Sequence, residues 1–223
     1  MELNVEAGYR IWADLYDGAK NPLIAAEELY SEELLAGCRA STALDLGTGT
    51  GRHALALARQ GVRVAAVDSS PEMLSVARRA AARERLEIHF LLASMDRPLP
   101  FADRSFDLIV CALALTHISG INGPLRECYR VVRQSGHLLV TDFHPDAVAF
   151  GWRSHFDHSG TRYFLPNVGH TRQGYLDAMS EAGFEPVQVI DVPISKLPTG
   201  YIPEETVRQH PGLNLCFISL GRK

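Results

Sequence analysis

Residues 42–58, TALDLGTGTGRHALALA, decide the fold of this 223-residue chain. A short apolar run from Thr42 to Leu46 is followed by the turn Gly47-Thr48-Gly49-Thr50-Gly51, and then by an alanine- and leucine-rich stretch with helical spacing. Glycine permits a positive φ and lets a ligand approach the backbone, and the start of a helix presents oriented N–H groups. The pattern therefore predicts a strand, a tight turn suited to a ligand, and a helix.

The alternation of short apolar runs and helical segments continues on both sides of this unit. Strands are predicted at 42–46, 62–67, 86–92, 106–112 and 136–142. Helices are predicted at about 50–60, 71–83 and 121–133, and a loop with Pro98 and Pro100 at 93–105. Strands joined by helices favour a mostly parallel sheet that is covered on both faces. A helix near 171–182 then precedes strands at 184–192 and 213–220, which are joined by a Pro/Gly-rich loop and predict an antiparallel pair at the sheet edge.

The composition is that of an ordinary globular chain, with 46% hydrophobic and 22% charged residues. A net charge of −4 predicts no basic surface for a nucleic acid or an anionic membrane. The cysteines lack paired spacing and predict free thiols in a reducing compartment: Cys38, Cys111, Cys128 and Cys216. The chain has no apolar run of membrane-spanning length, and its start is unlike a signal peptide. We therefore expect a cytoplasmic protein with no membrane span and no nucleic-acid partner.

The spacing of the glycines helps to choose the ligand. Dinucleotide sites favour G-x-G-x-x-G, but here the third glycine comes one place early, at Gly51, and Arg52 occupies the expected position. This argues against an NAD(P) oxidoreductase. Asp68 ends the next predicted strand, twenty-one residues after Gly47, where a carboxylate can accept hydrogen bonds from ribose hydroxyls. Alone, Asp68 would be interpreted as a surface acid that caps the next helix, but together with the glycine loop it favours the ribose role.

Several stretches in the same order resemble the class I S-adenosylmethionine-dependent methyltransferases, in the small-molecule branch that includes ubiquinone- and menaquinone-pathway enzymes. They are Ala43–Ala58, Val67–Leu74, Leu99–Val110 and Glu127–Val140. The resemblance implies one methyltransferase domain over residues 1–223 and S-adenosylmethionine as cofactor. The fold class that we predict is α/β: a Rossmann-like, seven-stranded, mostly parallel sheet with an antiparallel edge hairpin.

The resemblance also implies which residues bind the cofactor. The glycine loop and Asp45 lie along its methionine portion, Asp68 takes the ribose hydroxyls, and the backbone after the fourth predicted strand faces the methionine amino group. The family usually has an acid after the third strand to accept a hydrogen bond from the adenine amino group, whereas this chain has Ser94 there and Asp96 two places along. The cofactor-binding residues so implied are Asp45, Gly47, Thr48, Gly49, Gly51, Asp68, Ser69, Ser94, Met95, Cys111 and Ala112.

Two segments outside this core are predicted to cover the site. Tyr9, Trp12 and Tyr16 share one helix face, and a second helix is predicted from about Pro22 to Gly37, so residues 1–40 are interpreted as a helical lid. The segment 143–170 breaks the strand–helix rhythm and is rich in aromatic residues and histidine. Loops of this length are usually functional or disordered, and the aromatic content argues against disorder. We predict a substrate-covering insertion; the alternative is a small β element that merely packs on the sheet.

The predicted reaction is attack by an O, N or C nucleophile on the activated methyl group, with a small, largely apolar or aromatic molecule as acceptor. A hydroxyl acceptor would need a base, for which His117, after the fourth predicted strand, is the first candidate. His144 and His170 are the second candidates. No bound metal is expected, because His155-x-x-His158 lacks a third ligand at a familiar spacing. The alternative function is that of a non-catalytic cofactor-binding relative that acts through a protein partner, and the oligomeric state is left open.

Overall fold

The computed structural model describes residues 1–18 and 20–223, and its largest element is a seven-stranded sheet. The strands are β1 (Thr42–Leu46), β2 (Arg63–Asp68), β3 (Ile88–Leu92), β4 (Phe106–Ala112), β5 (Val132–Phe143), β8 (Glu185–Pro193) and β9 (Asn214–Arg222). Their order is β3-β2-β1-β4-β5-β9-β8. The neighbours from β3 to β5 are parallel, and β9 is antiparallel to both β5 and β8. The predicted fold class is confirmed.

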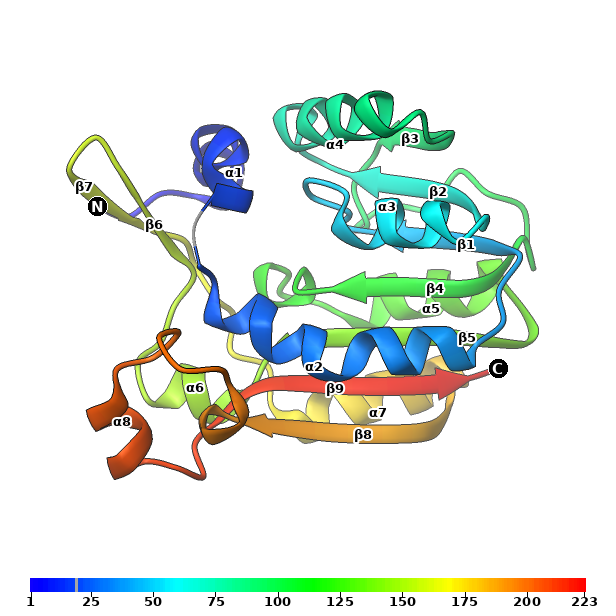
Figure 1. Ribbon diagram of the computed structural model, residues 1–223. Coiled ribbons are helices and arrows are strands. Elements are labelled where there is room, and N and C mark those ends of the chain that lie inside the picture. The colour runs from blue at the N-terminus through cyan, green and yellow to red at the C-terminus, as the bar shows by residue number, and fades with distance from the viewer. Residues whose placement is uncertain (19) are drawn as a thin grey trace.

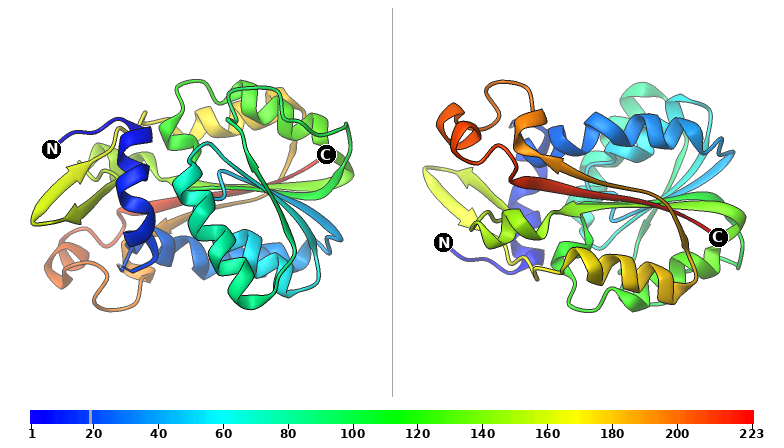
Figure 2. Two further views of the ribbon diagram at one scale, coloured as in Figure 1. Left: turned by 90° about the horizontal axis from the view of Figure 1, so that it is seen from above. Right: turned by 90° about the horizontal axis from the view of Figure 1, so that it is seen from below.

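Helices cover both faces of this sheet (Figure 2). One face carries α2 (Pro22–Gly37), α3 (Arg52–Arg59) and α4 (Pro71–Glu84), and the other carries α5 (Asn122–Val131) and α7 (Arg172–Ala182). Local sequence sets their ends. The Asn21 side chain accepts hydrogen bonds from the first turn of α2, and Gly183, with φ +109°, ends α7 in the left-handed conformation. A buried apolar core therefore lies on each side of the sheet.

β5 begins earlier than predicted, because no loop separates it from α5. Val132 directly follows the helix and already pairs with Phe106 of β4. The strand then bends: Ser135 has φ +64°, and a Cβ added to Gly136 would lie 2.8 Å from the Asp107 carbonyl oxygen. This close backbone approach and the register shift that accompanies it form an irregularity of the β-bulge type, which the apolar pattern of 136–142 does not record.

The remaining elements gather at the end of the sheet toward which β2 and β4 point (Figure 1). They are α1 (Val5–Trp12), the 3₁₀ helices η1 (Ala13–Gly18), η2 (Leu115–His117) and η3 (Ile194–Lys196), α6 (Pro145–Ala149), β6 (His155–His158), β7 (Thr161–Phe164) and α8 (Glu204–Gln209). In the insertion, β6 and β7 pair with each other as a two-stranded sheet, and Phe164 of β7 also makes an isolated parallel bridge with Glu2. The insertion therefore contains a β ribbon, but this ribbon packs on α1 through Trp12, Phe156 and Leu165 instead of joining the large sheet.

Two further observations concern membranes and metals. Within residues 1–18 and 20–223, no helix combines the length and apolarity needed to cross a membrane. In the same described part of the chain, no three His, Cys, Asp or Glu side chains are grouped so that they could hold a metal ion.

Candidate active site

The glycine loop is held tightly between the end of β4 and helix α4. Gly47 has φ +75°, and a Cβ there would lie 2.7 Å from the Ala114 Cβ. Gly51 is the N-cap of α3 and has φ +92°, and a Cβ added there would lie 3.1 Å from the Ala77 Cβ of α4. The N–H groups of Gly47 and Thr48 both donate to the Val67 carbonyl, at 2.8 and 2.9 Å. The turn therefore requires glycine for its backbone conformation and for its packing.

Two acidic side chains hold this loop through hydrogen bonds. The buried Asp45 accepts hydrogen bonds at Oδ2 from the Thr48 hydroxyl (2.6 Å) and the Ala54 N–H (3.0 Å), and burial raises its pKa. Asp68 accepts from the Gly49 N–H at Oδ2 and from the Ser70 N–H at Oδ1, both at 2.8 Å. Burial raises the pKa of Asp68, while these N–H donors act to lower it. Asp68 therefore organises the start of α4, and it also faces the cavity described next.

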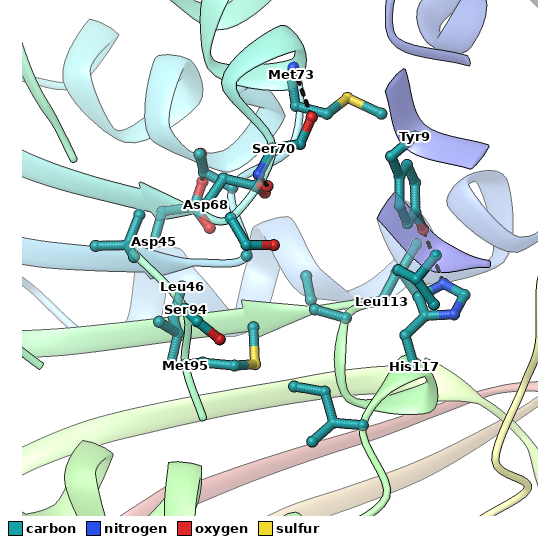
Figure 3. Close-up of a pocket in the computed structure, with 18 of the residues that line it drawn as sticks. Tyr9, Asp45, Leu46, Asp68, Ser70, Met73, Ser94, Met95, Leu113 and His117 are labelled. Carbon is teal, nitrogen blue, oxygen red and sulfur yellow. Dashed lines mark hydrogen bonds between the residues drawn. The ribbon is translucent and has the colours of Figure 1, made fainter. Parts of the chain in front are cut away.

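A cavity of about 350 Å³ opens beside the loop at the carboxyl ends of β1, β2 and β4. Figure 3 shows Asp68 and Ser94 on the opposite side of this cavity from Tyr9 and His117. The predicted cofactor-binding residues that line it are Asp45, Gly47, Thr48, Asp68, Ser69, Ser94, Met95 and Ala112. Gly49, Gly51 and Cys111 are not among the described residues that line it. Cys111 is buried within β4, and Gly51 packs on α4.

A second cavity, of about 520 Å³, adjoins the first. Its walls come from the N-terminal segment, the insertion and the loop before α8, and they carry many aromatic side chains: Tyr9, Trp12, Tyr16, Phe143, Trp152, Phe156, Phe164 and Tyr201. Of the described residues, only Tyr9, Tyr16 and Leu113 line both cavities. The two spaces are therefore neighbours across a wall of three side chains.

A column of stacked rings ties the N-terminal segment to the insertion. The ring of Trp12 stacks on the rings of Tyr9 and Phe156, with centroid distances of 5.8 and 5.0 Å. Phe156 in turn stacks on Tyr163, with a centroid distance of 5.2 Å. Tyr16 lies 4.9 Å from Trp12 in a tilted arrangement. The aromatic face that the sequence spacing indicates thus exists, although the α-helix ends at Trp12 and continues as the 3₁₀ helix η1.

Comparison with known proteins finds similarity to methyltransferases. Residues 44–140 match the model of a methyltransferase domain. The chain is 39% identical over 127 residues to a demethylmenaquinone methyltransferase of Tropheryma whipplei, covering 56% of this chain and 50% of that protein. A ubiquinone biosynthesis O-methyltransferase of Xanthomonas oryzae is 28% identical, over 62% of this chain and 59% of its own length. The matched part of the chain is therefore similar to methyltransferases.

Solved structures share the fold of this chain. A putative S-adenosylmethionine-dependent methyltransferase from Listeria monocytogenes superposes with a TM-score of 0.69 at 18% identity, over 90% of this chain and 99% of its own. The chain spans about half the length of the first of the curated relatives that it matches. The Listeria protein is named as dependent on S-adenosylmethionine. In the present chain, the cavity beside the glycine loop lies at the carboxyl edge of the sheet, where open α/β sheets bind their ligands.

The position that departs from the family pattern has two polar groups. The Ser94 hydroxyl oxygen accepts a hydrogen bond from the Asp96 N–H at 3.2 Å, and both residues line the cavity beside the glycine loop. The carboxylate of Asp96 is exposed at that rim. An acid is thus present near the expected place, two residues later along the chain.

A buried ionic cluster beside the cavity at the glycine loop was missed by the sequence analysis. Glu27 of α2 is fully buried, with Oε2 at 2.6 Å from Arg52 Nη1 and Oε1 at 3.0 Å from His53 Nε2. Burial acts to raise the pKa of Glu27, but His53 and Arg52 outweigh it and lower the pKa to about 2. Nearby, Thr50 of the glycine loop donates to Asp17 at 2.8 Å. In the sequence, Glu27 is one of several acids on a helix, so only the packing of α2 on α3 distinguishes it.

Of the three histidines predicted as candidate bases, His117 lines the cavity beside the glycine loop. Its Nδ1 lies 2.8 Å from the Pro166 carbonyl oxygen, which can only accept, so Nδ1 carries the proton and donates. Its Nε2 is therefore an acceptor, and it takes the hydrogen bond of the Tyr9 hydroxyl at 2.8 Å. Burial lowers the pKa of His117 and raises that of Tyr9. The imidazole is thus held neutral, with its basic nitrogen directed at Tyr9 (Figure 3).

The two other candidate histidines lie elsewhere. His144 caps α6, where its Nδ1 accepts from the Asp146 N–H at 3.1 Å. The His170 Nε2 donates to the Ile118 carbonyl at 2.7 Å. Neither belongs to the described linings of the two cavities. The structure thus gives both histidines local roles in capping and in joining loops.

Proposed function

We propose that the protein transfers the methyl group of S-adenosylmethionine to a small, largely apolar or aromatic acceptor of the quinone type. The observation that carries this proposal is the pair of adjoining cavities, one beside the glycine loop and one with aromatic walls, which share Tyr9, Tyr16 and Leu113. Methyl transfer needs the nucleophile and the methyl carbon in contact and in line, and two neighbouring cavities supply that arrangement. The activities for which the relatives are named, in menaquinone and ubiquinone synthesis, indicate the quinone class of acceptor.

In this proposal the first cavity holds the cofactor. Each carboxylate oxygen of Asp68 accepts one backbone hydrogen bond and retains a lone pair for a ribose hydroxyl. The methionine portion lies along Gly47 and Thr48, and the adenine lies near Ser94 and Asp96. The backbone N–H groups of the loop and the buried Asp45 keep this surface in one conformation before the cofactor arrives.

The second cavity suits an acceptor without a strong charge. Two of the ions in its walls are already paired: Arg153 with Glu2, at 2.6 Å, and Asp157 with Arg162, at 2.8 Å. A third ion, Lys20, lies over the Tyr201 ring, with Nζ 5.7 Å from the ring centroid. The rest of the lining is mostly aromatic and aliphatic, which favours a flat, apolar molecule. The N-terminal segment and the insertion form these walls together, so we propose that residues 1–40 act as the lid and 143–170 as the substrate-covering insertion.

If the acceptor nucleophile is a hydroxyl, Tyr9 and His117 form the proton path. Tyr9 lines both cavities and its hydroxyl donates to His117 Nε2. The acceptor proton passes to the Tyr9 oxygen as the Tyr9 proton passes to His117, while the acceptor oxygen bonds to the methyl carbon and the carbon–sulfur bond breaks. The positive charge of the sulfonium thus ends on His117, whose lowered pKa keeps it neutral and ready at pH 7.

Calorimetry tests the cofactor assignment. S-adenosylhomocysteine should bind in the micromolar range, about −8 kcal/mol, and NAD should give no signal. Turnover is then followed with methyl-labelled S-adenosylmethionine and 1,4-naphthalenediol as the probe acceptor. Binding of NAD in preference to S-adenosylhomocysteine would support an oxidoreductase instead. Cofactor binding without turnover of this acceptor or of a panel of phenols and amines would favour the non-catalytic relative.

Two variants test the proton path. His117→Ala and Tyr9→Phe should each lower kcat with a hydroxyl acceptor by about 10²-fold or more, the usual contribution of a general base. His144→Asn is the matched control, because asparagine retains the helix cap and this histidine lies outside both cavities. Full activity in both Tyr9→Phe and His117→Ala would show that positioning alone suffices. Loss confined to His144→Asn would move the base to the insertion.

A further inference from the structure

Leu113 has a backbone conformation that leucine rarely adopts. It directly follows Ala112, the last residue of β4, and its φ is +57°. In the left-handed region the Cβ of an L-residue crowds the backbone, so a leucine persists there only when its surroundings require it. Its N–H donates to the Thr141 carbonyl at 2.8 Å, which fixes the peptide in place.

Contacts on both sides of Leu113 leave the chain little choice of path. Ala114 packs against the glycine loop, where a Cβ on Gly47 would come within 2.7 Å of the Ala114 Cβ. Two residues later, the Thr116 N–H donates to the buried Asp142 at 2.6 Å, and the Thr116 carbonyl accepts from Val168 of the insertion at 2.7 Å. The turn at Leu113 thus joins the cofactor loop to the insertion within a few residues.

The side chain of Leu113 stands where the two cavities meet. Ala112, just before it, lines the cofactor cavity, and Thr116, just after the turn, lines the second cavity, whereas Leu113 lines both. Figure 3 shows Leu113 at the end of the cofactor cavity where Tyr9 and His117 lie. Tyr9 and Tyr16, which share the wall, belong to the N-terminal segment, so Leu113 is the part of the wall that the sheet itself holds.

We propose that Leu113 is a specificity-determining partition: its side chain sets the width of the opening between the cofactor and the acceptor. A narrow opening lets a small nucleophilic atom reach the methyl carbon and keeps groups larger than methyl from projecting out of the cofactor cavity. The strained backbone places the branched side chain in this opening, which a glycine in the same turn would leave empty. The proposal rests on the assignment of the two cavities in the proposed function.

The test uses a cofactor analogue and needs no acceptor. The probe is an analogue of S-adenosylmethionine in which a benzyl group replaces the methyl group on the sulfonium sulfur. Its Kd is divided by the Kd of S-adenosylhomocysteine, measured for the same variant by calorimetry. This ratio should fall by about 10-fold or more in Leu113→Ala and Leu113→Gly. Discrimination of this size is typical when a pocket gains room for one or two carbon atoms. Ile118→Ala is the control, because Ile118 lines the cofactor cavity and is absent from the described lining of the second.

The same variants test the backbone argument through their melting temperatures. Leu113→Gly should melt above Leu113→Ala, because alanine retains the unfavourable positive φ and glycine does not. A Kd ratio that stays at the wild-type value in both Leu113 variants, or that falls equally in Ile118→Ala, overturns the partition. Failure of the wild type to bind S-adenosylhomocysteine would instead overturn the proposed function, and the partition with it.

Discussion

Replacing Trp12 with alanine should open the N-terminal segment without unfolding the sheet. Only 8% of the Trp12 surface is exposed, and its ring contacts Tyr9, Tyr16 and Phe156. A buried tryptophan removes roughly 150–250 Å² from water, which is worth about 4–6 kcal/mol at about 25 cal/mol per Å². Measured Trp→Ala changes of about 3–5 kcal/mol agree with that range. We take about 4 kcal/mol as the expected loss.

This loss should affect only the packing of the N-terminal segment on the insertion. Trp12 belongs to a small cluster with Phe156 and Leu165, and this cluster is separate from the cores on the two faces of the sheet. The other ties between the same segments are weaker. The exposed ion pair of Glu2 with Arg153 contributes about 0–1 kcal/mol. The backbone hydrogen bonds of Phe164 with Leu3 and Met1 contribute about 1 kcal/mol each. The charged N-terminus also donates to the Arg162 carbonyl at 2.7 Å, in an exposed position. Each of these ties is weaker than the packing that Trp12 supplies.

Hydrogen exchange measured by mass spectrometry checks this expectation. In Trp12→Ala, amide protection should be lost over residues 1–18 and 155–164 and retained in β1, β4 and β5. The affinity for S-adenosylhomocysteine should fall at least about tenfold, equal to about 1.4 kcal/mol. Trp12→Phe is the control and should retain most of the stacking and the protection. Global loss of protection in Trp12→Ala, or unchanged protection of residues 1–18, would refute the reasoning.

Three further predictions concern the interior of the site. Gly47→Ala should lower the free energy of unfolding by about 1–3 kcal/mol, because its Cβ meets Ala114 at 2.7 Å and its φ is positive; urea unfolding measures it, and an unchanged midpoint would contradict the packing. Asp68→Ala should weaken S-adenosylhomocysteine binding by about 1.5–3 kcal/mol, as for hydrogen bonds to a charged group; unchanged affinity in calorimetry would leave Asp68 only its contacts with Gly49 and Ser70. Burial raises the pKa of Asp142 to about 7, against its N–H and hydroxyl donors. The folded state therefore keeps this proton to a higher pH than the unfolded state. The resulting contribution to the free energy of unfolding is complete below the ordinary Asp pKa of about 4 and is lost as the pH rises through about 7. Relative to Asp142→Asn, the wild type should lose up to roughly 4 kcal/mol between pH 4 and pH 8; a constant difference in urea unfolding across that range would show that Asp142 stays ionised.

Much of the sheet could be predicted because local pattern and final structure agree there. The run 42–46 and the run 106–112 are β1 and β4 with the predicted bounds. β5 could not be placed as well, because its start depends on pairing with Phe106 across the sheet and on a bend at Ser135, neither of which leaves an apolar period. The helix α8 was predicted as loop. It follows Pro203 and has Glu204 and Glu205 in its first turn, but at six residues it is too short to show a helical period.

The candidate site divides in the same way. The acids and glycines that line the cofactor cavity are close together along the chain or at strand ends, so spacing alone indicates them. The second cavity draws on the N-terminal segment, the insertion and the loop with Tyr201, because β8 ends at the same edge as the parallel strands and brings its loop there. The histidines show the limit most clearly: all three candidates follow or precede predicted elements, yet of these three only His117 belongs to the described linings of the two cavities.

The sequence by itself determined the α/β order, the glycine turn and the acid at the end of β2, because strand and helix periods, positive-φ glycines and helix caps are local properties of the chain. Tertiary structure alone decided that Glu27 pairs with Arg52 and His53, that Tyr9 occupies the basic nitrogen of His117, and that Leu113 stands between two cavities. The physical reason is that a buried charge, a hydrogen bond over 108 residues and a shared wall each depend on which surfaces pack together. That packing depends on long-range contacts, which leave no period in the sequence.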